Sequence, residues 1–312
     1  MNSKIAILGA GGFIGTNLAQ RLAGEVADLR CFGRRQDFPS MWQGLNWISG
    51  EVSGGEVVRT ISGCDTVIHL ASTSTPATAD RRIADDAEFN VIDTLKLLDQ
   101  CVEAGVSRVV FISSGGTVYG ICDRIPTPEN TPTNPITAYG VAKLAIEKYL
   151  AVYRHQRGLD YRILRVANPF GPFQTSRKGQ GVVAAVIASA LHDTTLQVWG
   201  DGRVVRDYVY VSDVVAAIVK SLDHTGDSRI FNIGSGKGHD VLQVVHAVEA
   251  LSNKKLRLDF RSARPVDVPT SILDAGLAAR ELDWHCAVDF EAGLANTLEW
   301  MRAFEARPSG QL

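Results

Sequence analysis

KIAILGAGGFIG occupies residues 4–15. Its apolar run predicts a buried strand over Lys4–Leu8, and the apolar spacing that follows predicts a helix over Phe13–Ala23. The glycines of GAGGFIG suit a strand-to-helix turn, in which the backbone approaches a pyrophosphate and a helix N-terminus offers free N–H groups. Because the turn lies between a strand and an amphipathic helix, we expect it to bind a dinucleotide.

Apolar runs alternate with segments of helical period up to about residue 168. The expected strands lie at 29–32, 66–70, 108–113 and 161–166, and the expected helices at 90–104 and 138–157. Continuous apolar strands alternating with helices are typical of a parallel sheet that is covered on both faces. The sequence therefore predicts an α/β fold with a doubly wound, Rossmann-type sheet.

The alternation of apolar runs with helical segments ends after Asn168, where prolines, glycines and polar residues interrupt it. A helix near 181–192, strands at 196–199 and 208–210, and terminal helices are expected beyond it. We therefore expect two units. Residues 1–168 and 207–234 would form the dinucleotide-binding domain, and residues 169–206 and 235–312 a smaller α/β substrate lobe.

Composition excludes several classes of function. The 312 residues carry a net charge of −2, so no basic surface for nucleic acid or anionic membranes is expected. The apolar run at the N-terminus is too short for a signal peptide or an anchor, and no other run approaches a bilayer-spanning length. Five widely spaced cysteines form no CxxC pair and suggest reduced thiols and no metal site. A cytoplasmic protein is expected.

The end of the second strand lacks the acidic residue that usually binds the ribose hydroxyls of NAD. The chain instead reads Gly33-Arg34-Arg35, and two guanidinium groups can hold a 2′-phosphate by bidentate contacts. This favours acceptance of NADP, although arginines in a solvated turn would give the same pattern. Glu51 and Val52 are candidates to flank the adenine ring. The expected cofactor is thus NAD or NADP.

A phenol and an ammonium group lie four residues apart in the expected helix 138–157. Tyr139 and Lys143 therefore share one helix face. A lysine near both the phenol and a positively charged nicotinamide favours the phenolate, which would pull the tyrosine pKa from about 10 toward neutrality. Such a tyrosine is a usable acid and base, so we expect it to be catalytic.

With these motifs in view, the chain resembles the extended short-chain dehydrogenase/reductase family, and within it the nucleotide-sugar epimerases and dehydratases. The resemblance rests on motifs that follow the family order through nearly the whole chain: GAGGFIG (9–15), HLA (69–71), NV (90–91), SSGGTVYG (113–120), YGVAK (139–143), LRVANPFGP (164–172), WGDGRVVRDYVYVSDV (199–214), FNIGSG (231–236) and RPVDV (264–268). It implies a UDP- or dTDP-sugar bound between the lobes. It also implies a homodimer formed through the helices at 90–104 and 138–157.

The resemblance assigns binding residues to both ligands. The expected cofactor contacts are Gly9, Gly12, Phe13, Ile14, Gly15, Gly33, Arg34, Arg35, Glu51, Val52, Leu70, Ala71, Ser72, Asn90, Ser113, Tyr139 and Lys143. The expected substrate contacts are Thr73, Thr117, Asn168, Val182, Trp199, Arg206, Arg264 and Asp267. Among these, the two arginines would pair with phosphates, Asp267 would hold a ribose hydroxyl and Trp199 would lie near the base. Structural ion pairs are the alternative for the arginines, and core packing is the alternative for Trp199.

One catalytic group departs from the family pattern. Gly115 stands where relatives carry a serine or threonine, five residues before Gly120. If the segment is extended, Thr117 points to the same face as Gly115 and can supply the hydroxyl, with Ser114 as a second candidate. The remaining alternative is that neither does so and Tyr139 works with water.

The absence of acidic residues in this loop decides between reactions. Dehydratases of this kind carry carboxylates at the positions of Gly116 and Thr117, so elimination of water is disfavoured. The leading hypothesis is a 4-epimerase for a UDP-hexose, UDP-N-acetylhexosamine or UDP-hexuronate of surface polysaccharides such as O-antigen. The polar loops 73–76 and 174–177 could line the hexose, and Arg177 or Lys178 could bind a carboxylate. An NADP-dependent 4-ketoreductase is the runner-up, and a non-catalytic dinucleotide sensor is the third hypothesis.

Overall fold

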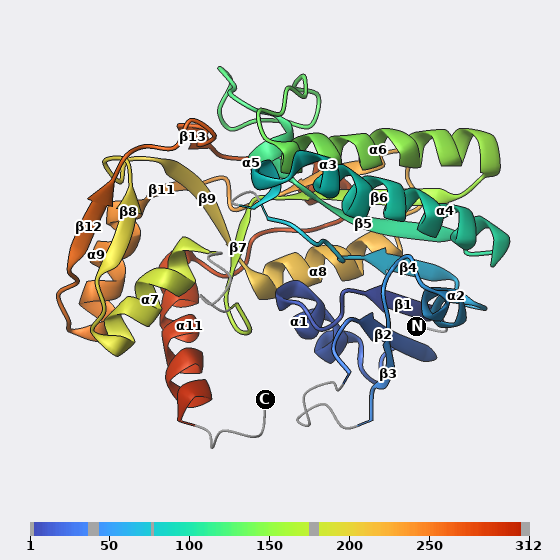
Figure 1. Ribbon diagram of the computed structural model, residues 1–312, viewed down its shortest axis with the longest axis horizontal. Helices are drawn as coiled ribbons and strands as arrows, with labels where there is room; N and C mark the ends of the chain where they lie inside the picture. Colours follow the sequence, from blue (N-terminus) through green and yellow to red (C-terminus); the bar gives the residue numbers. More distant parts are fainter. Residues whose placement is uncertain (1–2, 37–43, 76–77, 175–180, 307–312) are drawn as a thin grey trace.

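A seven-stranded sheet organises the larger part of the molecule (Figure 1). The computed structural model describes residues 3–36, 44–75, 78–174 and 181–306. The strand order is β10 (Ile230–Ile233), β6 (Asp160–Val166), β5 (Arg108–Ser114), β4 (Thr66–His69), β1 (Lys4–Leu8), β2 (Asp28–Gly33) and β3 (Asn46–Ser49). All neighbouring strands run parallel. The expected doubly wound α/β fold is confirmed.

Alternate residues of β1 face opposite layers of helices. Ile5 and Ile7 belong to one buried core together with side chains of α1 (Phe13–Leu22) and α8 (Val211–Leu222). Ala6 and Leu8 belong to another core, which includes side chains of α2 (Gly55–Ile61), α4 (Asp93–Glu103) and α6 (Ala138–Arg157). Successive side chains of a strand point to opposite faces, so a continuous apolar run is what a sheet with two covered faces requires.

A smaller unit packs beyond the carboxyl ends of the large sheet (Figure 1). Its strands β11 (Gly238–Asp240), β9 (Val205–Tyr210) and β13 (Thr270–Ser271) form one sheet, β7 (Asn168–Phe170) pairs with β9, and β8 (Leu196–Trp199) pairs with β12 (Leu258–Arg261). The helices α7 (Val182–His192), α9 (Val241–Ser252) and α11 (Phe290–Glu305) enclose a third core with them. After β9 the chain returns to the large sheet through α8 and β10, and α10 (Gly276–Glu281) contacts β10. The division into domains at residues 168, 206 and 234 stays a prediction.

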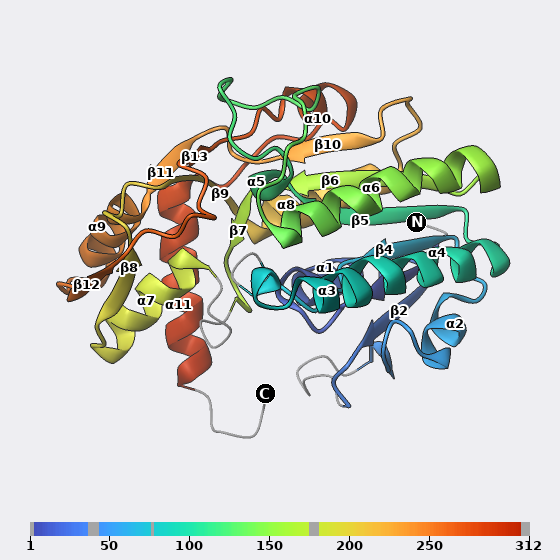
Figure 2. The same cartoon turned by 45° about the horizontal axis from the view of Figure 1, so that its top comes forward.

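Helix α6 has the bounds that the sequence predicts. The Oγ1 of Thr137 accepts a hydrogen bond from the backbone N–H of Gly140 at 3.1 Å and so caps the first turn. The helix ends at Gly158, which has a φ of 73° that glycine adopts without strain. These two ends place Tyr139 and Lys143 in the first two turns of α6, and α6 as a whole packs beside α4 (Figure 2).

Several segments before residue 120 differ from the sequence expectations. Strand β3 and helix α2 are not predicted by the apolar pattern. The helix expected from residue 90 begins earlier, because α3 (Ile83–Asp86) and a π-helical turn, η3 (Ala87–Ile92), lead into α4. The loop expected after β5 instead forms the short helix α5 (Gly115–Val118). Each difference bears on the site described below.

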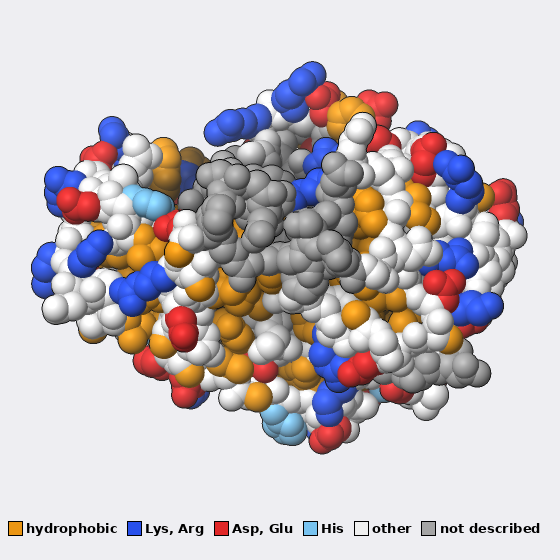
Figure 3. Space-filling model, turned by 90° about the horizontal axis from the view of Figure 1, so that it is seen from below, with side chains coloured by type: hydrophobic (Ala, Val, Ile, Leu, Met, Phe, Trp, Pro, Cys, Tyr) orange, Lys and Arg blue, Asp and Glu red, His pale blue; other side chains and the backbone are white. Residues whose placement is uncertain are grey.

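The surface carries charges of both signs. Figure 3 shows Lys and Arg together with Asp and Glu toward both ends of the underside, and hydrophobic side chains near its middle. This mixture agrees with the net charge of −2. Within the described ranges, no helix combines the length and the apolar composition that crossing a bilayer needs.

Candidate active site

The glycine-rich turn between β1 and α1 leaves no space for side chains. A Cβ on Gly15 would overlap the carbonyl oxygen of Gly9, and a Cβ on Gly9 would lie 2.8 Å from the backbone nitrogen of Ala71. Gly9 also has a φ of 88°, and Gly12 is the N-cap of α1, so no side chain covers the N–H groups of the first helical turn. A backbone cradle at a helix N-terminus fits the pyrophosphate of a dinucleotide.

We expect Gly15→Ala to weaken dinucleotide binding by about tenfold or more, because the added methyl group displaces the turn that forms the cradle. Titration of the purified protein with NADH or NADPH, followed by nucleotide fluorescence, measures the effect. Gly55→Ala is the matched control, since a Cβ there meets no atom within 4 Å. Equal affinities for both variants would contradict the assignment of the turn.

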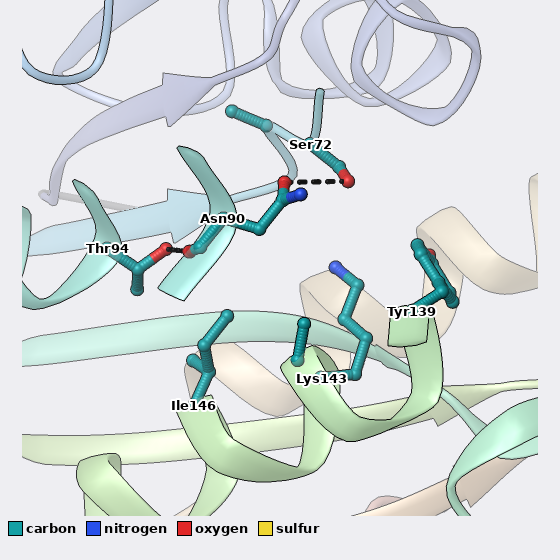
Figure 4. Close-up of a pocket in the computed structure, with 8 residues that line it drawn as sticks. Ser72, Asn90, Thr94, Tyr139, Lys143 and Ile146 are labelled. Carbon is teal, nitrogen blue, oxygen red and sulfur yellow. Dashed lines mark hydrogen bonds between the residues drawn. The ribbon is translucent and has the colours of Figure 1, made fainter. Parts of the chain in front are cut away.

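The predicted catalytic pair and three predicted cofactor contacts line one pocket (Figure 4). Its walls come from the end of β4, from η3 and α4, and from α6. The lining residues are Ala71, Ser72, Asn90, Thr94, Tyr139, Ala142, Lys143 and Ile146. Chain segments up to 75 residues apart in sequence therefore meet here, as the motif order implies. The binding roles of these residues stay predictions.

Asn90 holds the loop that follows β4. Its Oδ1 accepts hydrogen bonds from the backbone N–H of Thr73 at 3.0 Å and the Oγ of Ser72 at 3.2 Å. Its Nδ2 donates to the Oγ of Ser74 at 3.1 Å and to Oδ1 of Asp86 at 2.9 Å. Since both ends of the amide are engaged inside the protein, Asn90 fixes the shape of the pocket wall.

Lys143 lines the pocket, and its ammonium group is held in place by a hydrogen bond and by neighbouring rings. The Nζ donates to the carbonyl oxygen of Ile112 at 2.9 Å and lies 4.7 Å from the ring centre of Phe111. It also lies 5.6 Å from the ring centre of Tyr139. Burial lowers the pKa of Lys143 to about 8, while the nearby carboxylates of Asp86 and Glu147 act in the opposite direction. The ammonium form therefore predominates at neutral pH.

The pKa of Tyr139 moves in the direction opposite to the one expected from its lysine neighbour. Burial, followed by the Asp86 carboxylate, raises the pKa of Tyr139 to about 12. This direction holds for the protein groups alone, because burial destabilises the phenolate. The expected fall of the pKa toward neutrality includes a positively charged nicotinamide beside Tyr139 and stays a prediction. The phenol is protonated at neutral pH unless a further positive charge lies close to it.

Asp86 is a site residue that the sequence analysis missed. Its side chain is 5% exposed, it influences both catalytic residues, and it accepts the hydrogen bond from Asn90. The residue ends α3, directly before the π-helical turn. A pair of acidic residues in a helical segment usually marks a solvated face, so no local pattern distinguishes Asp86 from the neighbouring Asp85.

The SSGGTVYG segment corrects the argument for Thr117. Strand β5 ends at Ser114 and residues Gly115–Val118 are helical, so Thr117 and Gly115 do not share a face as they would in an extended segment. A Cβ on Gly115 would overlap the buried side chain of Leu273, which explains the glycine at this position. Ser114 and Thr117 are both partly buried and stay the two candidates for the hydroxyl.

The hydroxyl group of Ser113 is hydrogen-bonded to one member of a buried ion pair. Its Oγ donates to Oε1 of Glu147 at 2.5 Å, and the Ser113 side chain is 3% exposed. Glu147 in turn accepts from Nη2 of Arg165 at 2.6 Å, and both charged side chains are almost fully buried. The hydroxyl of Ser113 therefore faces the interior, which leaves its backbone for the cofactor contact that the resemblance predicts.

Four predicted substrate residues gather in the smaller unit. Arg264 forms a bidentate pair with Asp267, at 2.8 and 3.0 Å, and its guanidinium lies 5.5 Å from the ring centre of Trp199. Arg206 lies 3.7 Å from the same aspartate and donates to the carbonyl oxygens of Val205 and Val268. The two arginines are thus ion-paired in the protein, and Trp199, which is 44% exposed, does not belong to the core.

The remaining predicted contacts lie at separate places. Nδ2 of Asn168 donates to the carbonyl oxygen of Asp207 at 3.2 Å, and a Cβ on Gly116 would lie 3.8 Å from that nitrogen. Val182 is the first residue of α7 and is exposed. Pro76 and residues 175–178, including Arg177 and Lys178, lie outside the described residues. Among the described residues, no three His, Cys, Asp or Glu side chains are grouped so as to hold a metal ion.

Residues 5–234 match the family described as "NAD dependent epimerase/dehydratase family". This match covers most of the chain. The protein belongs to the NAD dependent epimerase/dehydratase family. The expected resemblance is thereby confirmed, and the cradle at the N-terminus of α1 fits the nucleotide that the family name implies.

Members of the epimerase/dehydratase family resemble the chain over its full length. The UDP-glucose 4-epimerase of Mycolicibacterium smegmatis is 32% identical over 96% of this chain and 98% of its own. The dTDP-4-dehydro-6-deoxyglucose reductase of Escherichia coli is 29% identical, over 96% and 97%. The crystal structure of a UDP-glucose 4-epimerase with UDP-glucose from Thermotoga maritima superposes with a TM-score of 0.91 at 33% identity, covering 98% of this chain and 100% of that one.

Proposed function

We propose that the protein is an NAD(P)-dependent nucleotide-sugar 4-epimerase that acts on a UDP-hexose, a UDP-N-acetylhexosamine or a UDP-hexuronate. The observation that carries the proposal is the pocket in which Tyr139 and Lys143 lie next to the strand end that borders the dinucleotide turn. The two positions where dehydratases carry acids hold Gly116 and Thr117, so the chain lacks the groups for elimination. Reversible oxidation at C4 needs only one acid–base group.

A nicotinamide dinucleotide held at the turn between β1 and α1 would supply reversible hydride transfer at C4 of the sugar, so that either face of that carbon could be reduced. Tyr139 takes the proton of the C4 hydroxyl and gives it back, which requires the phenol pKa to fall from about 12. Lys143 lies on the same helix face with its ammonium directed into the site, and a positive charge near the phenolate favours that form. Ser114 or Thr117 would donate a hydrogen bond to the same oxygen.

The cluster in the smaller unit suits the nucleotide half of the substrate. Arg206 and Arg264 would exchange part of their pairing with Asp267 for the diphosphate, and the freed carboxylate would hold a ribose hydroxyl. Trp199 presents an exposed ring beside Arg264, as a stacking partner for a base requires. Asn168 lies between this cluster and the catalytic loop.

We further propose a cytoplasmic homodimer that acts in surface-polysaccharide synthesis. Support for the dimer comes from large apolar side chains left exposed on α3, η3 and α6, three elements that pack against one another. These side chains are Ile83, Phe89, Ile92, Val141, Tyr149 and Val152. Exposed apolar side chains on neighbouring elements are typical of a subunit interface.

Proton NMR of the purified protein with UDP-glucose, UDP-galactose, and their N-acetylated and uronic counterparts tests the proposal. We expect one pair of 4-epimers to interconvert without added cofactor, because epimerisation regenerates the nicotinamide in each cycle. No interconversion of any pair, even with added NAD and NADP, would overturn the epimerase assignment. The Tyr139→Phe protein provides the matched inactive control.

A 4-ketoreductase is the second candidate, favoured by Arg34 and Arg35 and by the likeness to the dTDP-4-dehydro-6-deoxyglucose reductase of Escherichia coli. A reductase consumes one NADPH in each turnover, whereas an epimerase leaves the cofactor unchanged. Absorbance at 340 nm in the presence of a 4-keto sugar nucleotide separates the two. A stoichiometric loss of NADPH would favour the reductase.

A further inference from the structure

Trp47 covers the end of β2 where dinucleotide-binding proteins recognise the adenosine ribose. Strands β2 and β3 pair in parallel, with Cys31 opposite Trp47 and Gly33 opposite Ser49. A Cβ built on Gly33 would lie 2.7 Å from Cη2 of the indole, and a Cβ on Gly11 would lie 3.3 Å from the same atom. The six-membered ring of Trp47 therefore occupies the space above both glycines.

This ring excludes any side chain at position 33. Recognition of NAD usually depends on a carboxylate at the end of the second strand, which accepts hydrogen bonds from the ribose hydroxyls. Here a carboxylate at position 33 would require the indole to move, since an aromatic ring cannot yield by the rotation of a flexible terminus. The packing of Trp47 against Gly33 thus accounts for the absence of an acidic residue at position 33.

The same indole holds the chain that carries the two arginines. Nε1 of Trp47 donates to the carbonyl oxygen of Arg35 at 3.1 Å, and the aliphatic part of the Arg35 side chain passes near Gly11 in the dinucleotide turn. Both Arg34 and Arg35 are exposed, so their guanidinium groups are not committed to the core. Two exposed guanidinium groups provide the positive charge that a phosphate monoester requires.

We propose that Trp47 is a specificity-determining residue for the dinucleotide. By filling the space above Gly33, it excludes a ribose-binding carboxylate, and by binding Arg35 it anchors the cationic segment beside the turn. The protein then binds the 2′-phosphorylated nucleotide at least as tightly as the unphosphorylated one. The inference rests on the proposed use of a nicotinamide dinucleotide and is independent of the identity of the sugar.

A double-mutant cycle on Gly33 and Trp47 tests the proposal. The wild-type protein, Gly33→Asp, Trp47→Ala and the double variant are freed of bound nucleotide and titrated with NADH and with NADPH, without sugar. In the wild type we expect the Kd for NADPH to be equal to or lower than that for NADH. Gly33→Asp alone is expected to weaken both by about tenfold or more, because the side chain collides with the indole and its charge repels the 2′-phosphate.

The double variant is the decisive measurement. Removing the indole makes room for the new carboxylate, so we expect NADH affinity to return to within about threefold of wild type while NADPH stays at least about tenfold weaker. Trp47→Phe keeps an aromatic ring but removes the N–H that binds Arg35, so we expect it to weaken NADPH binding more than NADH binding. Thermal melts of each variant show whether it is folded.

Two results would overturn the proposal. One is a wild-type protein that binds NADH about tenfold or more tightly than NADPH, which needs no variant at all. The other is a Gly33→Asp protein that binds NADH as tightly as wild type while Trp47 is still present. Both are binding measurements, so a failure of the sugar NMR assay would reject the proposed activity and leave this inference standing.

Discussion

Tyr139→Phe is expected to lower kcat by about 10³-fold while leaving NADH and NADPH affinities within about threefold of wild type. The substitution removes only the hydroxyl that exchanges a proton with the substrate, and the ring keeps its place in the first turns of α6. Turnover of the sugar nucleotide identified by NMR, together with nucleotide fluorescence titration, measures both quantities.

Tyr161→Phe is the matched control for this experiment. It removes a tyrosine hydroxyl near the start of β6, at the opposite end of the sheet from the pocket. We expect its kcat to equal that of wild type. If the Tyr139 variant kept full turnover, the acid–base role would be rejected, and a parallel loss of cofactor affinity would indicate a disturbed pocket instead.

Loss of the buried partner of Arg165 is expected to have the largest effect on stability. Glu147→Ala leaves a guanidinium group that is 2% exposed without its carboxylate, and breaking a buried pair in this way typically costs about 3–5 kcal/mol. The free energy of unfolding from urea titrations at pH 7 measures this loss. The Glu147→Met/Arg165→Met double variant should be destabilised by less than Glu147→Ala, because no charge is then left buried and unpaired.

Lys255→Ala is the control for Glu147→Ala. It breaks the ion pair between Lys255 and Glu249 in which the lysine side chain is 89% exposed, and we expect a change of about 0–1 kcal/mol. If Glu147→Ala were as stable as this surface variant, the buried pair would have little net value. Arg165 would then be satisfied by other partners, such as the Tyr119 hydroxyl at 2.9 Å.

The elements with long, regular patterns could be predicted from the sequence. Helix α6 has an apolar period over 20 residues, a Thr137 cap and a terminal Gly158, and its observed bounds match the prediction. Strand β3 has four residues with no fully buried position, so it lacks the apolar run that identified its neighbours. An edge strand of this length is defined by its pairing with β2, which a local pattern does not contain.

The candidate site likewise contains residues that the sequence predicts and residues that it does not. Tyr139 and Lys143 could be predicted to share the pocket because they lie four residues apart on one helix face. Asp86 and the Arg165–Glu147 pair depend on contacts between different segments, and no local pattern shows that Glu147 pairs with Arg165 or that Asp86 faces Tyr139. The argument for Thr117 failed on a different ground: it assumed an extended backbone, whereas residues Gly115–Val118 form a helical turn directly after Ser114.

The position of β10 has a consequence for synthesis on the ribosome. This strand hydrogen-bonds to β6 at the outside of the large sheet, yet residues 167–229, including part of the smaller unit, lie between the two in sequence. Until residue 233 has left the exit tunnel, β6 is an uncovered edge with free N–H and C=O groups. The nascent chain must therefore pass through a stage in which its most apolar sheet is open to association with other chains, and it leaves that stage only when the return strand has been translated.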